Sequence, residues 1–221
     1  MALTKEQIES NKAEVIDLLR QVKRDGIEKL IEWLDKKSDF FTAPSSTVFH
    51  GNYEGGLCEH SLNVYHALVR LKNAMSDMAL EEKKFDNIKD GSLIIVALLH
   101  DICKSNYYTK EIKYWKDENA SYNNQWKQYY AYTIDDKFPV GHGEKSVIML
   151  QNFITLKQEE ILAIRWHMTA YDPAVAVSPY EKPAFNKAMT ICPLLVLLSM
   201  ADVFAAQLME KAGNPKIDNA V

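Results

Sequence analysis

The sequence predicts an all-α protein that carries one inserted β-hairpin at about 105–140. Apolar residues recur at helical spacing through most of the chain, as is typical of amphipathic helices. The stretch 105–140 departs from this rhythm, because it is rich in Tyr and Trp, which favour strands, and contains turn-forming residues at 117–124. With 221 residues, 47% of them hydrophobic, the chain is long enough to build a core without disulfides, so we expect a single domain over 1–221.

The N-terminal elements follow from capping and turn residues. Thr4 and Gln7 form a capping-box pattern, and the apolar spacing behind them predicts a first helix that ends near Gly26. A second, shorter helix is expected over 27–34. The glycines and the proline of 38–56 then predict a loop.

The remaining helices are interrupted only by the hairpin and by short connections. They are expected at about 57–75, from 90 or 92 to 99, and at 142–154, 157–168, 184–190 and 192–211, with a charged connection at 81–90 and a proline-containing loop at 170–183. Thr155 and Gln158 predict a second capping box, at the start of the helix over 157–168.

Composition and charge exclude several classes of protein. The net charge of −4 and the pI near 5.9 argue against a nucleic-acid coat or a binder of anionic membranes, because both need a basic surface. Three cysteines without CxxC spacing favour a reduced, cytoplasmic compartment. The N-terminus lacks a signal-peptide pattern, and the longest apolar run, 191–201, is too short to cross a bilayer. We therefore expect a cytoplasmic protein without a membrane span.

Histidines and aspartates recur within or at the ends of the predicted helices. His100 and Asp101 end the apolar run 93–99, where a polar pair is costly unless it is compensated. An isolated Asp202 within an apolar segment likewise needs a partner, a metal or a solvated face. Taken singly, each such residue also fits a structural role, as a hydrogen-bonded core histidine or a helix cap. The full set that could surround one pocket is His60, His100, Asp101, His142, His167 and Asp202.

Four imidazoles and two carboxylates suffice for one divalent ion, or for two ions that a carboxylate bridges. These ligand types suit Mn, Fe, Ni, Co or Zn, so the sequence predicts one or two transition-metal ions of undetermined identity. His66 lies six residues after His60, about 240° around the helix, and is therefore expected to point elsewhere and to be structural.

Three segments carry a resemblance to a known family. Gly-Gly-Leu-Cys-Glu-His-Ser-Leu at 55–62, Ala-Leu-Leu-His-Asp-Ile-Cys-Lys at 97–104 and Ala-Asp at 201–202 resemble the HD-domain superfamily of metal-dependent phosphohydrolases. The resemblance covers about 50–210 and implies a helical metal-binding core there, preceded by a helical extension over 1–45. It is closest to the two-metal branch, which includes the HD-GYP cyclic dinucleotide phosphodiesterases and an HD-type 3′–5′ exoribonuclease.

The resemblance implies a division of roles among the candidate ligands. It implies that a first ion is held by His60, His100, Asp101 and Asp202. It implies a second ion on His142 and His167, with Asp101 as the bridge. Cys103 stands where the family's signature commonly has glycine, and no GYP segment follows, so cyclic di-GMP is not expected as the substrate.

The activity that the resemblance implies is hydrolysis of a phosphoester, of a nucleotide or another small molecule, by metal-activated water. Asp101 would orient the ions, and Lys104 would hold a phosphate oxygen, although a cation there also suits a helix C-terminus. Lys145 is a weaker candidate of the same kind. The hairpin could cover the pocket and stack a base on Tyr107 or Trp115, or it could pack on the body or form a dimer contact, which leaves a homo-oligomer open.

His50 is a further candidate for contact with substrate. We expect the partner to be a small phosphoester rather than an extended nucleic acid, because the chain is acidic overall. Two other functions remain open at this stage. The chain could be a di-iron oxygenase, because the myo-inositol oxygenase family uses a similar ligand set, or a non-catalytic nucleotide- or metal-binding module. Metal identity and oxygen dependence would separate these functions, whereas ligand spacing does not.

Overall fold

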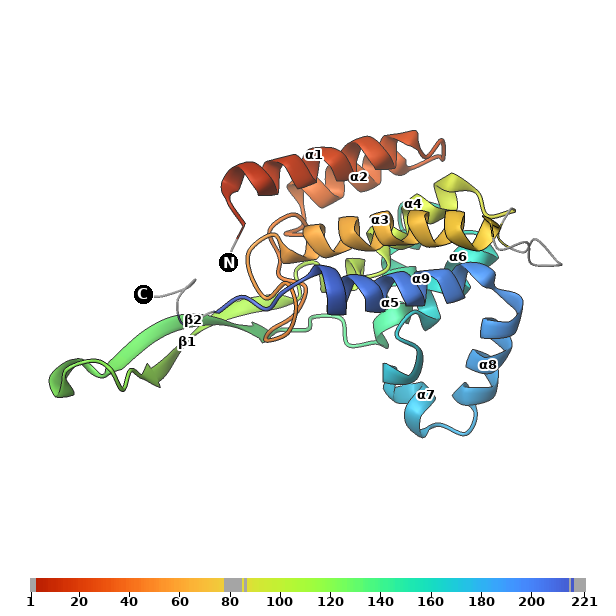
Figure 1. Cartoon of the computed structure of the whole chain (residues 1–221). Coiled ribbons are helices and arrows are strands. Elements are labelled where there is room, and N and C mark those ends of the chain that lie inside the picture. The colour runs from red at the N-terminus through yellow and green to blue at the C-terminus, as the bar shows by residue number, and fades with distance from the viewer. Residues whose placement is uncertain (1–2, 78–84, 86, 215, 217–221) are drawn as a thin grey trace.

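The computed structural model describes residues 3–77, 85, 87–214 and 216, and shows a helical body from which one β-hairpin projects (Figure 1). This confirms the predicted all-α fold with an inserted hairpin. The elements are α1 (Lys5–Gln21), α2 (Ile27–Lys36), α3 (Gly56–Asp77), α4 (Asp90–Leu99), β1 (Tyr108–Lys116), β2 (Trp126–Ile134), α5 (His142–Gln151), α6 (Gln158–Trp166), α7 (Pro173–Val177), α8 (Glu181–Ile191) and α9 (Pro193–Phe204). A π-helical turn, Ala205–Met209, continues α9. Residues 81–84 and 86 of the expected charged connection at 81–90 lie outside the described residues.

The first helix begins as expected but ends early. Thr4 and Gln7 form the capping box, in which each side chain accepts a hydrogen bond from the backbone N–H of the other. α1 then ends at Gln21, not near Gly26. Gly26 instead precedes α2 with a positive φ, and a Cβ there would collide with the carbonyl oxygen of Phe153. Gly26 is therefore needed at the start of the second helix rather than at the end of the first.

The core is built around α4. All eight residues of its 92–99 segment are buried, because α4 packs against α1, α3, α6 and α9. These four helices surround α4, which explains why its apolar run has no polar face. Among the described residues no single helix is long and apolar enough to cross a membrane, and the pair α8 and α9, which passes by length and composition, is bent by 101°.

A buried ion pair ties the α1–α2 connection to α6. Arg24 Nη1 and Nη2 lie 2.7 and 2.8 Å from the two carboxylate oxygens of Glu160, whose side chain is fully buried. Glu160 also accepts from the backbone N–H of Lys157, so it completes the cap of α6 itself. The capping box predicted from Thr155 and Gln158 was therefore wrong, because the N-cap of α6 is Lys157, two residues after Thr155.

The expected loop at 170–183 contains a helix. Asp172 caps α7 by accepting from the backbone N–H of Ala174, and Pro173 occupies the first turn. Arg165 Nη1 lies 2.6 Å from the same Asp172 carboxylate. A proline suits the first position of a helix as well as a loop, and residue type alone does not separate the two.

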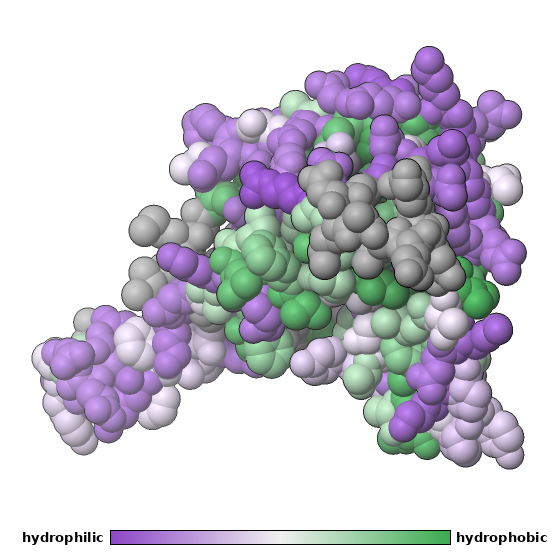
Figure 2. Space-filling view, turned by 45° about the vertical axis from the view of Figure 1, so that its right-hand side comes forward, coloured by the Kyte–Doolittle hydropathy of each residue, from purple (hydrophilic) through white to green (hydrophobic). Residues whose placement is uncertain are grey.

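The hairpin pairs β1 with β2 in antiparallel register, from Tyr108 opposite Ile134 to Lys116 opposite Trp126. Its base touches the body, where the Tyr108 hydroxyl donates to the carbonyl of Ser45 at 3.3 Å. Beyond the base the hairpin extends away from the helices, and its surface in Figure 2 is largely hydrophilic to neutral. The hairpin therefore does not fold back over the helical body.

Candidate metal centre

His60 enters the centre from α3, at the point where a loop packs closely against the start of the helix. A Cβ on Gly56 would collide with the carbonyl oxygen of Gly51, so this approach requires glycine. One turn further along α3, His60 is 1% exposed and lies on the buried face with Leu57 and Val64. The Gly-Gly pair thus places the loop directly beside the first histidine.

His100 and His167 are oriented in the same way at the ends of two different helices. Each directly follows the last residue of its helix, α4 or α6. His100 Nδ1 donates to the carbonyl of Ala97 at 2.9 Å, and His167 Nδ1 donates to that of Ile164 at 2.7 Å. Carbonyls in the last turn of a helix lack helical partners, so these bonds satisfy them. Because Nδ1 carries the proton in each ring, Nε2 presents a lone pair to the centre.

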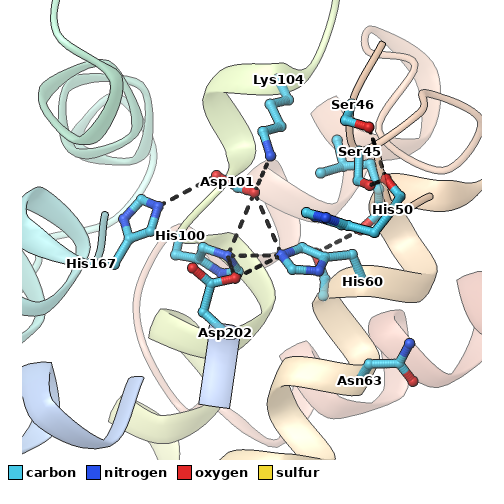
Figure 3. A network of polar contacts seen from close by, with 12 residues as sticks. Ser45, Ser46, His50, His60, Asn63, His100, Asp101, Lys104, His167 and Asp202 are labelled. Carbon is cyan, nitrogen blue, oxygen red and sulfur yellow. Dashed lines mark hydrogen bonds and ion pairs between the residues drawn. The ribbon is translucent and has the colours of Figure 1, made fainter. Parts of the chain in front are cut away.

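The carboxylate of Asp101 lies between His167 on one side and His60 and His100 on the other (Figure 3). Its Oδ1 is 2.7 Å from Nε2 of His142 and 3.5 Å from Nε2 of His167. Its Oδ2 is 3.6 Å from Nε2 of both His60 and His100. One carboxylate therefore presents a separate oxygen to each pair of imidazoles.

Asp202 completes the group around His60 and His100. Its Oδ1 lies 3.3 Å from Nε2 of His60 and 4.0 Å from Nε2 of His100. The two Nε2 atoms are 3.3 Å apart. Asp202 reaches this position from α9, which packs against α3.

The donor set fits divalent metal ions. The Nε2 atom of His167 is buried and has no hydrogen-bond partner within the described residues. Four sets of potential ligand atoms lie within 4.8 Å of one another among the described residues. They are His60 with His100 and Asp202, His100 with Asp101 and His167, Asp101 with Cys103 and His142, and His50 with His60 and Glu210. Converging imidazole nitrogens and carboxylate oxygens are the ligands that borderline transition metals prefer.

The electrostatics keep the carboxylates ionised. Burial opposes ionisation of Asp101, but the neighbouring Lys104 ammonium group and the hydrogen bond with His142 outweigh it and hold the pKa well below its usual range. Burial also opposes ionisation of Asp202, but the contact with His60 outweighs it and lowers the pKa of the Asp202 carboxyl group. Burial lowers the pKa of His100 to about 4, which favours the neutral imidazole that a metal needs.

Glu210 is a partner of the centre that sequence reasoning missed. Its Oε1 accepts from Nδ1 of His60 at 3.0 Å and from Nδ2 of Asn63 at 3.2 Å. Burial alone would lower the pKa of His60, but Glu210 and Asp202 raise it to about 10. Glu210 directly follows the π-helical turn Ala205–Met209. The sequence offered Glu210 only as part of a solvated face with Asp202, and its pattern did not indicate the contact with His60.

Three of the remaining candidate residues line one cleft. This cleft of about 430 Å³ opens beside His142 and is lined by Lys104, Tyr107 and Lys145 among others. Lys145 forms an ion pair with Asp136 and lies 4.7 Å from the Tyr107 ring centroid. Lys104 Nζ is 2.6 Å from Oδ2 of Asp101.

Other histidines and Trp115 differ in their relation to the centre. His50 lies against His60, with ring centroids 5.2 Å apart. His66 is half-exposed and pairs with Glu14 at 3.0 Å, as expected for a residue that points elsewhere. Trp115 lies on the projecting hairpin, where Lys216 stacks on it at 5.2 Å, and it does not line the cleft.

Comparisons with known proteins agree with this geometry. The sequence model of the HD domain matches residues 57–207. A 110-residue stretch is 33% identical to the dihydroneopterin 2′,3′-cyclic phosphate phosphodiesterase of Methanocaldococcus jannaschii, covering 44% of this chain and 42% of that relative. No solved structure gives a significant match. The match over 57–207, which contains all six candidate ligands, shows that the chain belongs to the HD domain family.

Proposed function

We propose that this protein is a metal-dependent phosphohydrolase that hydrolyses a phosphoester of a nucleotide or a related small molecule. The observation that carries the proposal is the position of Asp101, with one oxygen towards His142 and His167 and the other towards His60 and His100. A carboxylate in this position suits a bridge between two divalent ions. Such ions, when bound, polarise a phosphoryl oxygen and lower the pKa of a water molecule.

Lys104 supplies a positive charge next to the bridging carboxylate. Burial disfavours its charged form, but Asp101 outweighs burial and raises the pKa of the ammonium group. Lys104 therefore stays protonated and can hold a phosphate oxygen while Asp101 stays ionised. Since both residues lie within one turn of chain, the geometry between them is set by the 3₁₀ turn Ile102–Lys104.

The cleft beside His142 has the chemistry of a nucleotide-sized subsite. Lys145 adds a second ammonium group, and Tyr107 adds an aromatic face on which a base can stack. The volume of about 430 Å³ suits a small molecule and not an extended polymer. The acidic net charge of −4 favours the same choice.

The similarity to a cyclic phosphate phosphodiesterase supports a hydrolase over an oxygenase. Because this chain covers 42% of that relative, the substrate of the relative is not transferred to this protein. The hydrolysis of a phosphodiester is the step that we expect first, with a phosphomonoester as the alternative.

The test is an assay of the Mn²⁺-, Co²⁺- or Zn²⁺-loaded protein on p-nitrophenyl phosphate, bis(p-nitrophenyl) phosphate and a 2′,3′-cyclic nucleotide. We expect turnover of at least one ester, reduced about 100-fold or more in Asp101→Asn. Turnover that survives Asp101→Asn would contradict the proposal. Failure to hydrolyse any ester, together with oxygen uptake by the iron-loaded protein, would favour the di-iron oxygenase instead.

A further inference from the structure

A thiol lies beside the half of the centre that contains His142. Cys103 belongs to the 3₁₀ turn that directly follows Asp101, and its backbone N–H donates to Oγ of Ser146 at 3.3 Å. Its Sγ is 3.4 Å from Nδ1 and 3.7 Å from Nε2 of His142. Cys103 is 3% exposed, and what it exposes contributes to the wall of the cleft.

The separation of these atoms matches a shared metal ion. Nitrogen and sulfur ligands with bonds of about 2.1 and 2.3 Å lie about 3.6 Å apart at a tetrahedral angle. In the structure, Sγ of Cys103 and Nε2 of His142 lie 3.7 Å apart. One ligand atom from each of Asp101, Cys103 and His142 lies within 4.8 Å of the others. A thiol that only filled space in the core would not have to lie within ligand distance of both Asp101 and His142.

A second observation, at Oδ1 of Asp101, also points to an ion. This oxygen is the one that lies 2.7 Å from Nε2 of His142. Nε2 of His167 is fully buried, lacks a hydrogen-bond partner in the described structure, and lies 3.5 Å from Oδ1 of Asp101. Nδ1 of His167 is occupied by the carbonyl of Ile164, so the unpartnered Nε2 presents a lone pair. A buried lone pair without a donor is costly, and a cation at this oxygen would satisfy it.

We propose that Cys103 is a ligand of the second ion, through its thiolate, together with Asp101, His142 and His167. The thiol proton is released to solvent when the metal–sulfur bond forms. A sulfur ligand shifts the preference of this position towards Zn²⁺, Co²⁺ and Fe²⁺ and away from Mg²⁺ and Mn²⁺. The inference rests on the metal centre of the proposed function, and it adds a ligand and a metal preference to it.

The other two cysteines supply matched controls. Cys58 and Cys192 are buried like Cys103, but neither belongs to a group of potential metal ligands within the described residues. The Cys192 thiol instead donates to the carbonyl of Glu159. Of the three cysteine substitutions, only that of Cys103 should therefore remove the sulfur ligand.

The experiment is a Co²⁺ titration of the full chain, followed through the near-ultraviolet thiolate-to-cobalt charge-transfer band, with bound cobalt counted by elemental analysis. We expect the band in the wild-type protein, Cys58→Ala and Cys192→Ala, and its loss in Cys103→Ala. The Zn²⁺ dissociation constant of the second equivalent should rise about tenfold or more in Cys103→Ala, while that for Mn²⁺ changes less. Cys103→Ser and Cys103→Gly, checked by circular dichroism, replace the alanine variant if it does not fold.

The outcomes separate this inference from the proposed function. Binding of two cobalt equivalents without a charge-transfer band, or a band that persists without Cys103, would overturn the inference and leave the metal centre intact. A wild-type protein that binds no cobalt would overturn both. A band that disappears in Cys192→Ala or Cys58→Ala, rather than in Cys103→Ala, would also overturn the assignment.

Discussion

Glu210 and His60 lie 150 positions apart in the chain, and their side chains meet at 3.0 Å between Oε1 and Nδ1. The contact orients the imidazole, so that its Nε2 faces the carboxylates of Asp101 and Asp202. A carboxylate behind a ligating histidine raises the basicity of the ring and restricts its rotation. Glu210 is thus a positioning residue for the centre.

We expect Glu210→Gln to weaken metal binding about 10- to 100-fold, because the amide keeps the size of the side chain but loses its charge. Isothermal titration with Zn²⁺ or Mn²⁺ measures this change. Glu59→Gln is the matched control, since Glu59 lies next to His60 in the chain but accepts from the Tyr53 hydroxyl at 2.6 Å. Equal losses in the two variants would mean that the effect reports general electrostatics rather than the orientation of His60.

Replacing a buried and an exposed histidine should give opposite results. His100→Ala removes a fully buried ligand candidate from the centre, and we expect it to lose bound metal. His66→Ala removes a half-exposed ring that pairs with Glu14, and it should keep its full metal content. Its stability should change by less than about 0.5 kcal/mol, as is usual for exposed positions. Elemental analysis of both proteins, purified in parallel, is the measurement, and metal loss in His66→Ala would place the centre on the other face of α3.

The two aromatic candidates of the hairpin region should differ in their effect on substrate. Tyr107 lines the cleft. Tyr107→Ala should therefore raise KM for a nucleotide ester by roughly five- to 150-fold, which corresponds to about 1–3 kcal/mol of stacking. Trp115→Ala should leave KM unchanged, because Trp115 lies on the projecting strand beside Lys216. Steady-state kinetics of the two variants on the best ester of the panel measure the change in KM. A larger rise in KM in Trp115→Ala than in Tyr107→Ala would show that the hairpin folds over the cleft when substrate binds.

The ion pair between Arg24 and Glu160 should contribute to the acid sensitivity of folding. Burial acts to raise the pKa of Glu160, but Arg24 outweighs it and the pKa is lowered. A carboxyl group whose folded pKa is depressed stabilises the fold above its unfolded pKa of about 4.3, and this contribution disappears as the pH falls through the folded pKa. The free energy of unfolding, measured by urea denaturation across a pH series, should therefore fall with decreasing pH below about 4.3. A flat profile there would contradict the prediction.

Removal of Arg24 leaves the buried carboxylate unpaired. We expect Arg24→Met to lower the free energy of unfolding by about 3–5 kcal/mol at neutral pH, measured by urea denaturation. Arg20→Met is the control, because Arg20 is exposed and lies 3.6 Å from Glu28, which is also exposed. Its change should stay below about 1 kcal/mol. If the two variants are equally stable, the Arg24 pair does not hold the α1–α2 connection to α6.

Local patterns in the sequence predicted the fold class and most of the helices. The apolar run 93–99 was expected as a helix, and the structure shows why it has no polar side, since it is enclosed by four other helices. The errors lie at helix boundaries and in one helix that was not expected. Pro173 begins α7 within a segment expected to be a loop, and α6 is capped at Lys157 rather than at Thr155. Glu160, which completes the cap at Lys157, is paired with Arg24 from a distant part of the chain, and a local pattern does not contain this contact. Pro173 suits the first turn of a helix as well as a loop, so residue type alone did not reveal α7.

The candidate ligands were also found from sequence, but their arrangement was not. His60, His100 and Asp202 were singled out because polar groups in apolar helices need a partner. Nothing in their spacing indicated that Asp101 would present one oxygen to each pair of histidines. The sequence made Tyr107 and Trp115 equal candidates for stacking on a base. The structure separates them, because the hairpin that carries Trp115 projects away from the body.

The sequence by itself determined the helical body, the hairpin, and the supply of imidazoles and carboxylates, because these follow from residue type and short-range periodicity. The tertiary structure alone decided which atoms meet. It brought Glu210 behind His60 through a π-helical turn, and it set Cys103 against His142 through the packing of α5 on the 3₁₀ turn. The physical reason is that ligand geometry depends on how helix ends from distant parts of the chain pack together, and this packing is a property of the whole core.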